Sequence, residues 1–241
     1  MNSVLRLLSV ESLKYQRTVV ARLAFGIPLL YGCFVLMGAI FLGSGLTIVG
    51  ETPWEAIARL FNTFWEVLIF PVGVIIISTQ ACQLVQVEGM WQRVATQPVS
   101  RLVIYIIHLI GVAGLVLCGV LIFSLTYLVI GMVLGARGAI PWSLLFGRPL
   151  LSWVAVLPML LIQTWISMRF RTGSVPLSFG MAGFLGGLVI NTTHIRVFVP
   201  WTYASAVHNL TQQSTVLLIS AFLSFLLLIT STIDISRRDA V

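Results

Sequence analysis

Long runs of apolar residues without any Asp, Glu, Lys or Arg dominate the hydrophobic pattern of this chain. The six runs cover 23–50, 67–87, 102–136, 149–168, 172–195 and 197–233. About 20 such residues suffice for an α-helix to cross the hydrocarbon core of a bilayer. Strands of a membrane β-barrel would instead alternate between two faces over about 10 residues. The pattern therefore predicts an all-α integral membrane protein with six transmembrane helices.

The six predicted spans occupy most of the chain. We place them at 20–43, 64–86, 102–134, 149–168, 174–192 and 214–233. Composition agrees, because 59% of the residues are hydrophobic and only 9% are charged, whereas a soluble domain carries about 25% charged residues. We therefore expect residues 1–241 to form a single transmembrane domain, with no separate soluble domain.

The basic residues predict the orientation of the spans. Six spans alternate the connecting segments between two sides. One side receives Arg6, Lys14, Arg17, Arg22, Arg93, Arg101, Arg169, Arg171, Arg237 and Arg238, and the other receives Arg59, Arg137, Arg148 and Arg196. Because cytoplasmic loops carry the excess of Lys and Arg, both termini are expected in the cytoplasm. The net charge of +7 follows this topology, so we expect no nucleic-acid partner.

Two segments outside the spans have helical signatures. Residues 1–19 mix apolar residues with Glu11, Lys14 and Arg17, which favours an N-terminal helix lying at the cytoplasmic interface. On the other side, Thr52 can cap a helix whose first turn accepts Pro53.

The last non-cytoplasmic segment is broken and aromatic. Residues 191–214 read NTTHIRVFVPWTYASAVHNLTQQS, with Arg196, Pro200, Trp201, Tyr203 and His208 as its distinctive side chains. We predict a re-entrant outer hairpin of two short helices, broken at Pro200, that dips partway into the outer leaflet. An ordinary surface loop is the alternative.

The loop between the second and third spans is the most specific local feature. It reads QVEGMWQRVATQPVSR over 86–101. Residues 88–96 are long enough for about two helical turns, and Pro98 would end them. An exposed Trp91 beside Met90 needs a partner or the membrane surface to cover it.

These motifs resemble the ABC-2 type exporter permeases. The resemblance rests on the acidic residue and short helix before QPVSR, on VESLKYQRT before the first span, and on the broken outer segment. Residues 161–190, which read LIQTWISMRFRTGSVPLSFGMAGFLGGLVI, resemble spans four and five of the lantibiotic-immunity and bacitracin-type subgroup. Many members have Gly-Thr after the loop glutamate, whereas this chain has Gly89, Met90 and Trp91.

The resemblance implies a type V exporter-like fold with a cytoplasmic coupling helix. The residues that would dock on a separate ATP-binding subunit are Glu88, Gly89, Met90, Trp91, Arg93 and Pro98. It further implies a second permease, identical or homologous, a bacterial inner-membrane location and contact with membrane lipid. ATP and Mg would bind in the partner subunit, because the chain lacks a GxxxxGK[ST] motif. We expect no cofactor on this chain and no enzymatic activity of its own.

The function implied is a permease subunit of an ATP-driven exporter that expels an amphipathic peptide such as a lantibiotic. The alternatives are a secondary transporter, or an ABC exporter of a lipid or other small hydrophobic substrate. A secondary transporter would be expected to have internal repeats or ionisable groups near mid-membrane, and neither stands out. A membrane-embedded enzyme would need clustered acid and base residues, which the sequence does not place together.

Single polar residues in the spans allow two interpretations each. Glu66 lies near a span boundary, which favours an interfacial side chain reaching water over a buried functional carboxylate. His108 is expected to cap or bond a neighbouring helix; the alternative, a proton relay, would need acidic partners, which the sequence does not place near it. The glutamines Gln80, Gln83, Gln86 and Gln163 either form interhelical hydrogen bonds, the favoured interpretation, or line a path. Cys33, Cys82 and Cys118 fit small core residues, and no metal site is expected.

Overall fold

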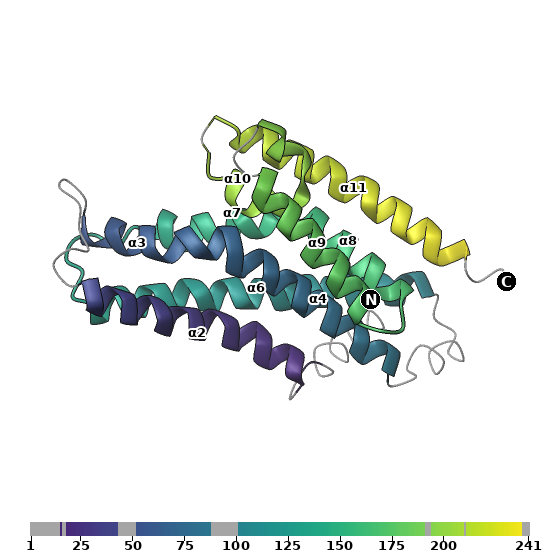
Figure 1. The fold of residues 1–241 in the computed structure, drawn as a ribbon, viewed down its shortest axis with the longest axis horizontal. Coiled ribbons are helices and arrows are strands. Elements are labelled where there is room, and N and C mark those ends of the chain that lie inside the picture. The colour runs from purple at the N-terminus through teal and green to yellow at the C-terminus, as the bar shows by residue number, and fades with distance from the viewer. Residues whose placement is uncertain are drawn as a thin grey trace, which may run out of the picture.

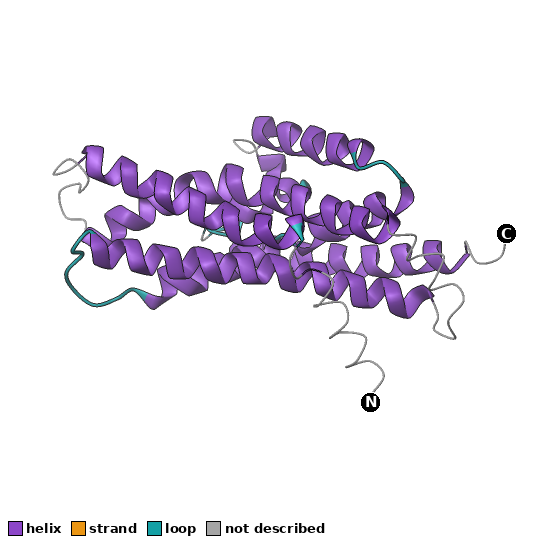
Figure 2. Cartoon of the chain, turned by 90° about the horizontal axis from the view of Figure 1, so that it is seen from below, coloured by secondary structure: helices purple, strands orange, loops and turns teal. Residues whose placement is uncertain are grey.

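The computed structural model describes residue 15 and residues 18–42, 52–87, 101–190, 194–209 and 211–237. All regular elements within these ranges are helices. The long helices run lengthwise and form an elongated bundle (Figures 1 and 2). Of the interfacial helix predicted at 1–19, only residues 15, 18 and 19 are described. Glu11, Lys14 and Arg17, and the coupling loop from Glu88 to Pro98, lie outside the described residues.

The first layer of the bundle pairs α2 (Val19–Leu42) with α6 (Arg101–Val133). The two helices match the predicted spans 20–43 and 102–134 to within a residue at each end. Gly32 faces Thr126 so closely that a Cβ on this residue would overlap the threonine methyl group. The absence of a side chain on Gly32 therefore permits the close approach of the two helices.

A second long helical segment runs beside this pair. It consists of α3 (Pro53–Phe64), η2 (Trp65–Ile69), which is a π-helical turn, and α4 (Phe70–Val87). The predicted start is confirmed: Thr52 Oγ1 accepts from the Glu55 amide at 3.3 Å, and the Glu55 carboxylate accepts from the Thr52 amide at 2.8 Å. This reciprocal pair is a capping box.

The second half of the chain contains a bent helix pair. The turn η3 (Ser143–Gly147) continues into α7 (Arg148–Ala155), and α8 (Leu157–Arg169) follows at an angle of 47°. Pro158 in the first turn of α8 lacks the amide hydrogen that would continue the helix. The predicted span at 149–168 is therefore two helices.

The last helices cover the outer faces of α8. The segment α9 (Ser174–Ile190) contacts α4 and α8, and α11 (Gln213–Arg237) packs along α8. Between them lie three short segments: η4 (His194–Phe198), η5 (Pro200–Thr202) and α10 (Tyr203–Ala206). The predicted break at Pro200 is confirmed, since Val199 before it has extended backbone angles.

Four described helical segments are long and apolar enough to cross a membrane, and a fifth is added if the bent pair counts as one span. They are Val19–Phe41, Pro53–Gln86, Leu102–Val133 and Gln213–Arg237, with Ser143–Arg169 as the bent pair. The fifth predicted span corresponds to α9, which has 17 residues and is at the short limit for crossing a bilayer. The structure supports four or five spans among the described residues, rather than the six predicted.

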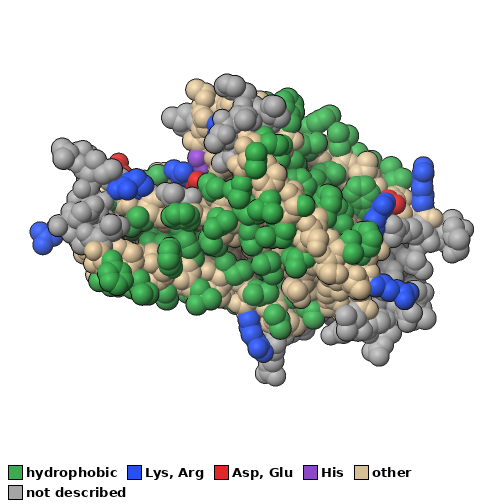
Figure 3. Space-filling model, viewed as in Figure 1, with side chains coloured by type: hydrophobic (Ala, Val, Ile, Leu, Met, Phe, Trp, Pro, Cys, Tyr) green, Lys and Arg blue, Asp and Glu red, His purple; other side chains and the backbone are tan. Residues whose placement is uncertain are grey.

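The surface of the bundle is apolar. Hydrophobic side chains cover the long face in Figure 3, and most charged side chains lie toward its ends. Leu30 on α2 and Leu218 on α11 expose 73% and 72% of their surface. Water would disfavour so extensive an exposed apolar face, so the face is suited to lipid.

Candidate functional site

The candidate site is built around the buried carboxylate of Glu66, in the π-helical turn η2. Arg148, the first residue of α7, holds both of its oxygens. The Arg148 Nε atom lies 2.6 Å from Oε1, and Nη2 lies 2.9 Å from Oε2. Only 5% of Glu66 is exposed, whereas about a third of the Arg148 side chain is. This two-point geometry is the strong form of an ion pair.

His208, just after α10, adds a third element to the same cluster. Its Nε2 atom lies 3.2 Å from Glu66 Oε1 and 2.7 Å from Ser152 Oγ. The Ser152 hydroxyl donates to the carbonyl oxygen of Ala204 at 3.1 Å. A hydrogen on Nε2 is consistent with both contacts of the ring. The four side chains, which we call the Glu66 cluster, therefore tie η2, α7 and the segment after α10 together.

The protonation of His208 follows from its surroundings. Burial, and then the positive charge of Arg148, lower the pKa of His208 to about 3. Contact with the Glu66 carboxylate would favour a proton on the ring, but Arg148 already neutralises that carboxylate. His208 is therefore a neutral hydrogen-bond donor at ordinary pH, and Arg148 alone balances Glu66.

The Glu66 cluster contains Ser, His and Glu, yet its geometry does not suit nucleophilic catalysis. In a catalytic triad the serine and the carboxylate bind opposite nitrogens of the imidazole ring. Here both contact Nε2. If Nε2 carries a hydrogen that it donates to Glu66, the same nitrogen cannot also accept a proton from Ser152. The arrangement is suited to holding helices together.

The position of Glu66 corrects the interfacial interpretation drawn from the sequence. The side chain does not reach water. It is buried against the pair Arg148 and His208, which lie 82 and 142 positions away. The sequence places Arg148 and His208 in segments on the non-cytoplasmic side, but no local pattern links either residue to Glu66. The one available signal was the uncommon occurrence of an acidic residue in a long apolar helix.

Besides His208, other residues of the predicted outer hairpin also make contacts in this region. Arg196 Nε donates to Gln212 Oε1 at 2.8 Å, and Tyr203 is fully buried. Trp201, which follows Pro200, packs against α9, where a Cβ on Gly183 would lie 2.5 Å from its ring. The segment is thus folded against α7 and α9. Its depth in a bilayer stays a prediction.

The predicted interhelical hydrogen bonds are present for two of the four glutamines, Gln163 and Gln86. Gln163 Nε2 donates to Thr79 Oγ1 at 2.9 Å and to the Pro176 carbonyl at 2.8 Å. Gln86 Nε2 donates to the Ser167 carbonyl at 2.8 Å. Gln80 is exposed instead. These contacts join α8 to α4 and to α9.

His108 on α6 forms a second buried contact group. Its Nδ1 atom lies 3.1 Å from the Tyr15 hydroxyl, and its Nε2 atom lies 3.4 Å from Cys82 Sγ. Cys82 in turn contacts the Thr164 carbonyl at 3.8 Å. The expected bond from His108 to a neighbouring helix is therefore present.

The described residues contain no group of three or more His, Cys, Asp or Glu side chains that could hold a metal ion. Cys33, Cys82 and Cys118 are free thiols, of which only Cys82 is buried.

Comparison of the chain with protein-family models, with curated proteins and with solved structures finds no match in any of the three.

Proposed function

We propose that this chain is the transmembrane permease subunit of an ATP-driven exporter that expels an amphipathic peptide, such as a lantibiotic. The membrane-spanning character rests on the long apolar helices. The exporter assignment rests on the resemblance of the 86–101 loop and its flanking segments to ABC-2 type permeases. ATP would be hydrolysed by a separate subunit, and a second permease would complete the path.

The observation that carries the proposal is the course of the helix between the loop and the Glu66 cluster. Val87, the last residue of α4, immediately precedes the loop that starts at Glu88. Glu66 lies 21 residues earlier in the same helical segment, which corresponds to roughly 30 Å at the α-helical rise. That length matches the hydrocarbon thickness of a bilayer. One helix thus connects the expected ATPase contact with the folded outer segment.

This connection supplies a physical route for coupling. A displacement of the loop would move α4 together with α8, because Gln86 and the Thr79–Gln163 contact bind the two helices to each other. At the far end, the Glu66 cluster would pass the displacement to α7 and to the segment around His208. The outer segment would then open or close the exit as ATP binding changes.

The second candidate function is that of a secondary transporter. The observation that favours it is Glu66, an ionisable group inside an apolar helix. The bidentate contact with Arg148 favours a fixed charge over a carried proton. An ABC exporter of a lipid would have the same coupling route, and only its substrate would differ.

The test co-expresses the chain with any ATP-binding subunit that is encoded beside it and purifies the assembled complex. The readout is ATP turnover with and without an added lantibiotic such as nisin. We expect Trp91→Ala to reduce the stimulation several-fold while assembly in the membrane is retained. Trp142→Ala is the matched control, because Trp142 is 59% exposed and lies far from the loop in sequence.

Two results would count against the proposal. One is stimulation that is unchanged in Trp91→Ala. The other is failure of any adjacent ATP-binding subunit to copurify with the wild-type chain.

A further inference from the structure

An apolar crevice lies on the side of the bundle, between α2 and the junction of α3 with η2. It has a volume of about 540 Å³, within the range of small-molecule sites. Leu30, Tyr31 and Phe34 line it from α2, and Phe64 and Leu68 line it from the other wall. Its walls include side chains that are exposed on the apolar surface, so the crevice opens toward the surroundings of the bundle.

The π-helical turn shapes one wall of this crevice. At its start the Trp65 amide bonds the Asn62 carbonyl, so the Phe61 carbonyl loses its usual partner. The Tyr31 hydroxyl donates to Phe61 O at 2.8 Å and to Leu60 O at 3.1 Å. The hydroxyl hydrogen of Tyr31, the one polar side chain among the described residues that line the crevice, is therefore used within the protein, and a guest would find no free side-chain donor on them.

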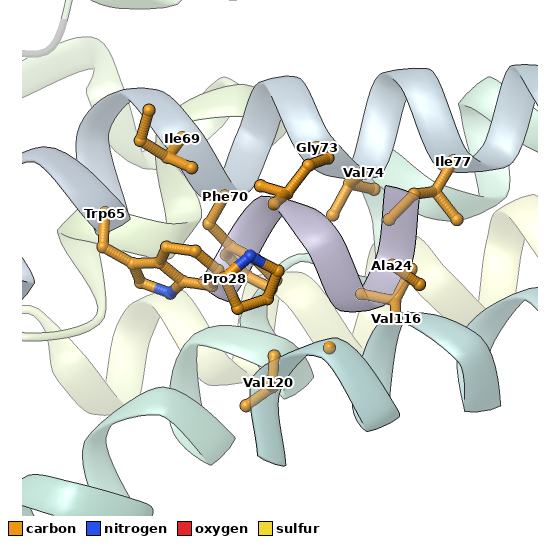
Figure 4. Close-up of a pocket in the computed structure, with 12 residues that line it drawn as sticks. Ala24, Pro28, Trp65, Ile69, Phe70, Gly73, Val74, Ile77, Val116 and Val120 are labelled. Carbon is orange, nitrogen blue, oxygen red and sulfur yellow. The ribbon is translucent and has the colours of Figure 1, made fainter. Parts of the chain in front are cut away.

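The crevice adjoins a smaller inner cavity, because Ile27 and Ile69 line both. The inner cavity measures about 20 Å³ and lies between Pro28, Trp65, Gly73 and their neighbours (Figure 4). Such an apolar space stays dry even where one water molecule would fit. It can instead take the end of a hydrocarbon chain that lies in the crevice.

We propose that the crevice is a binding site for one acyl chain of a membrane phospholipid. The site lies on the two helical segments that are expected to cross the bilayer, so acyl chains are the apolar molecules that reach it. The described lining offers apolar surface without a free side-chain hydrogen-bond donor, which suits a hydrocarbon chain better than a polar guest. The inference rests on the membrane-spanning part of the proposed function and is independent of ATP-driven transport.

The experiment uses the full chain in phosphatidylcholine nanodiscs that contain a phosphatidylcholine with a diazirine in one acyl chain. After brief transfer to lipid-free detergent, the sample is irradiated and labelled peptides are mapped by mass spectrometry. We expect label at Leu30, Phe34, Phe64 and Leu68 to exceed label on α11 several-fold, because a chain held in the crevice survives the transfer.

Two matched variants test the crevice itself. Leu30→Trp fills its mouth, whereas Leu218→Trp places the same side chain on α11 at nearly the same exposure. We expect Leu30→Trp to lower crevice labelling several-fold and Leu218→Trp to leave it unchanged.

Three outcomes overturn the inference in distinguishable ways. Equal labelling of the crevice and α11 before and after transfer indicates surrounding lipid only. An unlabelled crevice, together with oxidised dimers of Leu30→Cys in a background from which Cys33, Cys82 and Cys118 have been removed, indicates that a second copy of the chain covers it. Absence of label on both the crevice and α11 in intact nanodiscs contradicts the membrane-spanning assignment as well.

Discussion

Arg148 and Glu66 form a bidentate ion pair across 82 positions of sequence, with Nε–Oε1 and Nη2–Oε2 distances of 2.6 and 2.9 Å. The pair joins the π-helical turn η2 to the start of α7. Because Glu66 is buried and Arg148 only partly so, the arginine can still reach water if its partner is removed, but the carboxylate cannot. The two single substitutions are therefore not equivalent.

The first prediction follows from this asymmetry. Arg148→Gln removes the cationic partner of the buried carboxylate and leaves it the neutral ring of His208; loss of one partner costs about 3 kcal/mol in typical buried pairs. Glu66→Gln should cost less, since Arg148 can turn to solvent. The measurement is the thermal unfolding midpoint of the purified protein, and the double variant should recover part of the loss.

Glu55→Gln on α3 is the control for loss of a carboxylate. Glu55 is exposed, and glutamine can keep the capping bond, so its midpoint should stay near wild type. Additive losses in the Glu66 and Arg148 double variant would show that the two side chains are not coupled.

The second prediction concerns pH and His208. The pKa of His208 is lowered from 6.5 to about 3 by burial and by Arg148, so between these values the unfolded chain binds a proton that the folded chain does not. Stability is then full above pH 6.5 and falls as the pH drops toward 3. His208→Gln should flatten this decline in the unfolding midpoint between pH 6.5 and pH 4.

Replacement of a distant histidine separates this effect from general acid sensitivity. His108→Gln should keep the wild-type slope in the same pH range if the slope comes from His208. A slope that is identical in wild type and His208→Gln would contradict the assignment.

Much of the fold was predictable because local patterns carry it. The capping box at Thr52 and the bounds of α2 and α6 follow from capping chemistry and from continuous apolar runs. The cluster around Glu66 was not predictable in this way, because its members come from segments that tertiary packing alone brings together. The contact of Tyr31 with the Phe61 carbonyl beside the π-helical turn spans 30 positions, which no short window contains. The break before α8, by contrast, coincides with a local signal, Pro158.

The third prediction uses two glycines of α9. A Cβ on Gly183 would lie 2.5 Å from the Trp201 ring, whereas a Cβ on Gly186 has nothing within 4 Å. Gly183→Ala should therefore displace Trp201 and destabilise the protein by about 1–3 kcal/mol. Gly186→Ala should be neutral or slightly stabilising. Unfolding midpoints and Trp fluorescence provide the measurements, and equal behaviour of the two variants would contradict the packing.

The fourth prediction concerns the attachment of α11 to α8. Asp234 accepts hydrogen bonds from Trp165 Nε1 at 3.0 Å and from Arg169 Nη2 at 2.7 Å. Only 17% of the residues in the most apolar stretch of α11 are buried, so burial of apolar side chains contributes little to holding this helix. Asp234→Ala should loosen the end of α11 and increase amide hydrogen exchange over 226–237. Thr232→Ala, which removes a hydroxyl that bonds only within α11, should leave that exchange unchanged.

We propose that this chain carries an amphipathic peptide across a membrane at the expense of ATP. The decisive measurement is uptake of fluorescent nisin into inverted membrane vesicles that contain the chain and any ATP-binding subunit encoded beside it. We expect accumulation that requires ATP, persists with a protonophore and falls several-fold in Trp91→Ala but not in Trp142→Ala. Accumulation driven by a proton gradient without ATP, or none beyond that of vesicles lacking the chain, would contradict it.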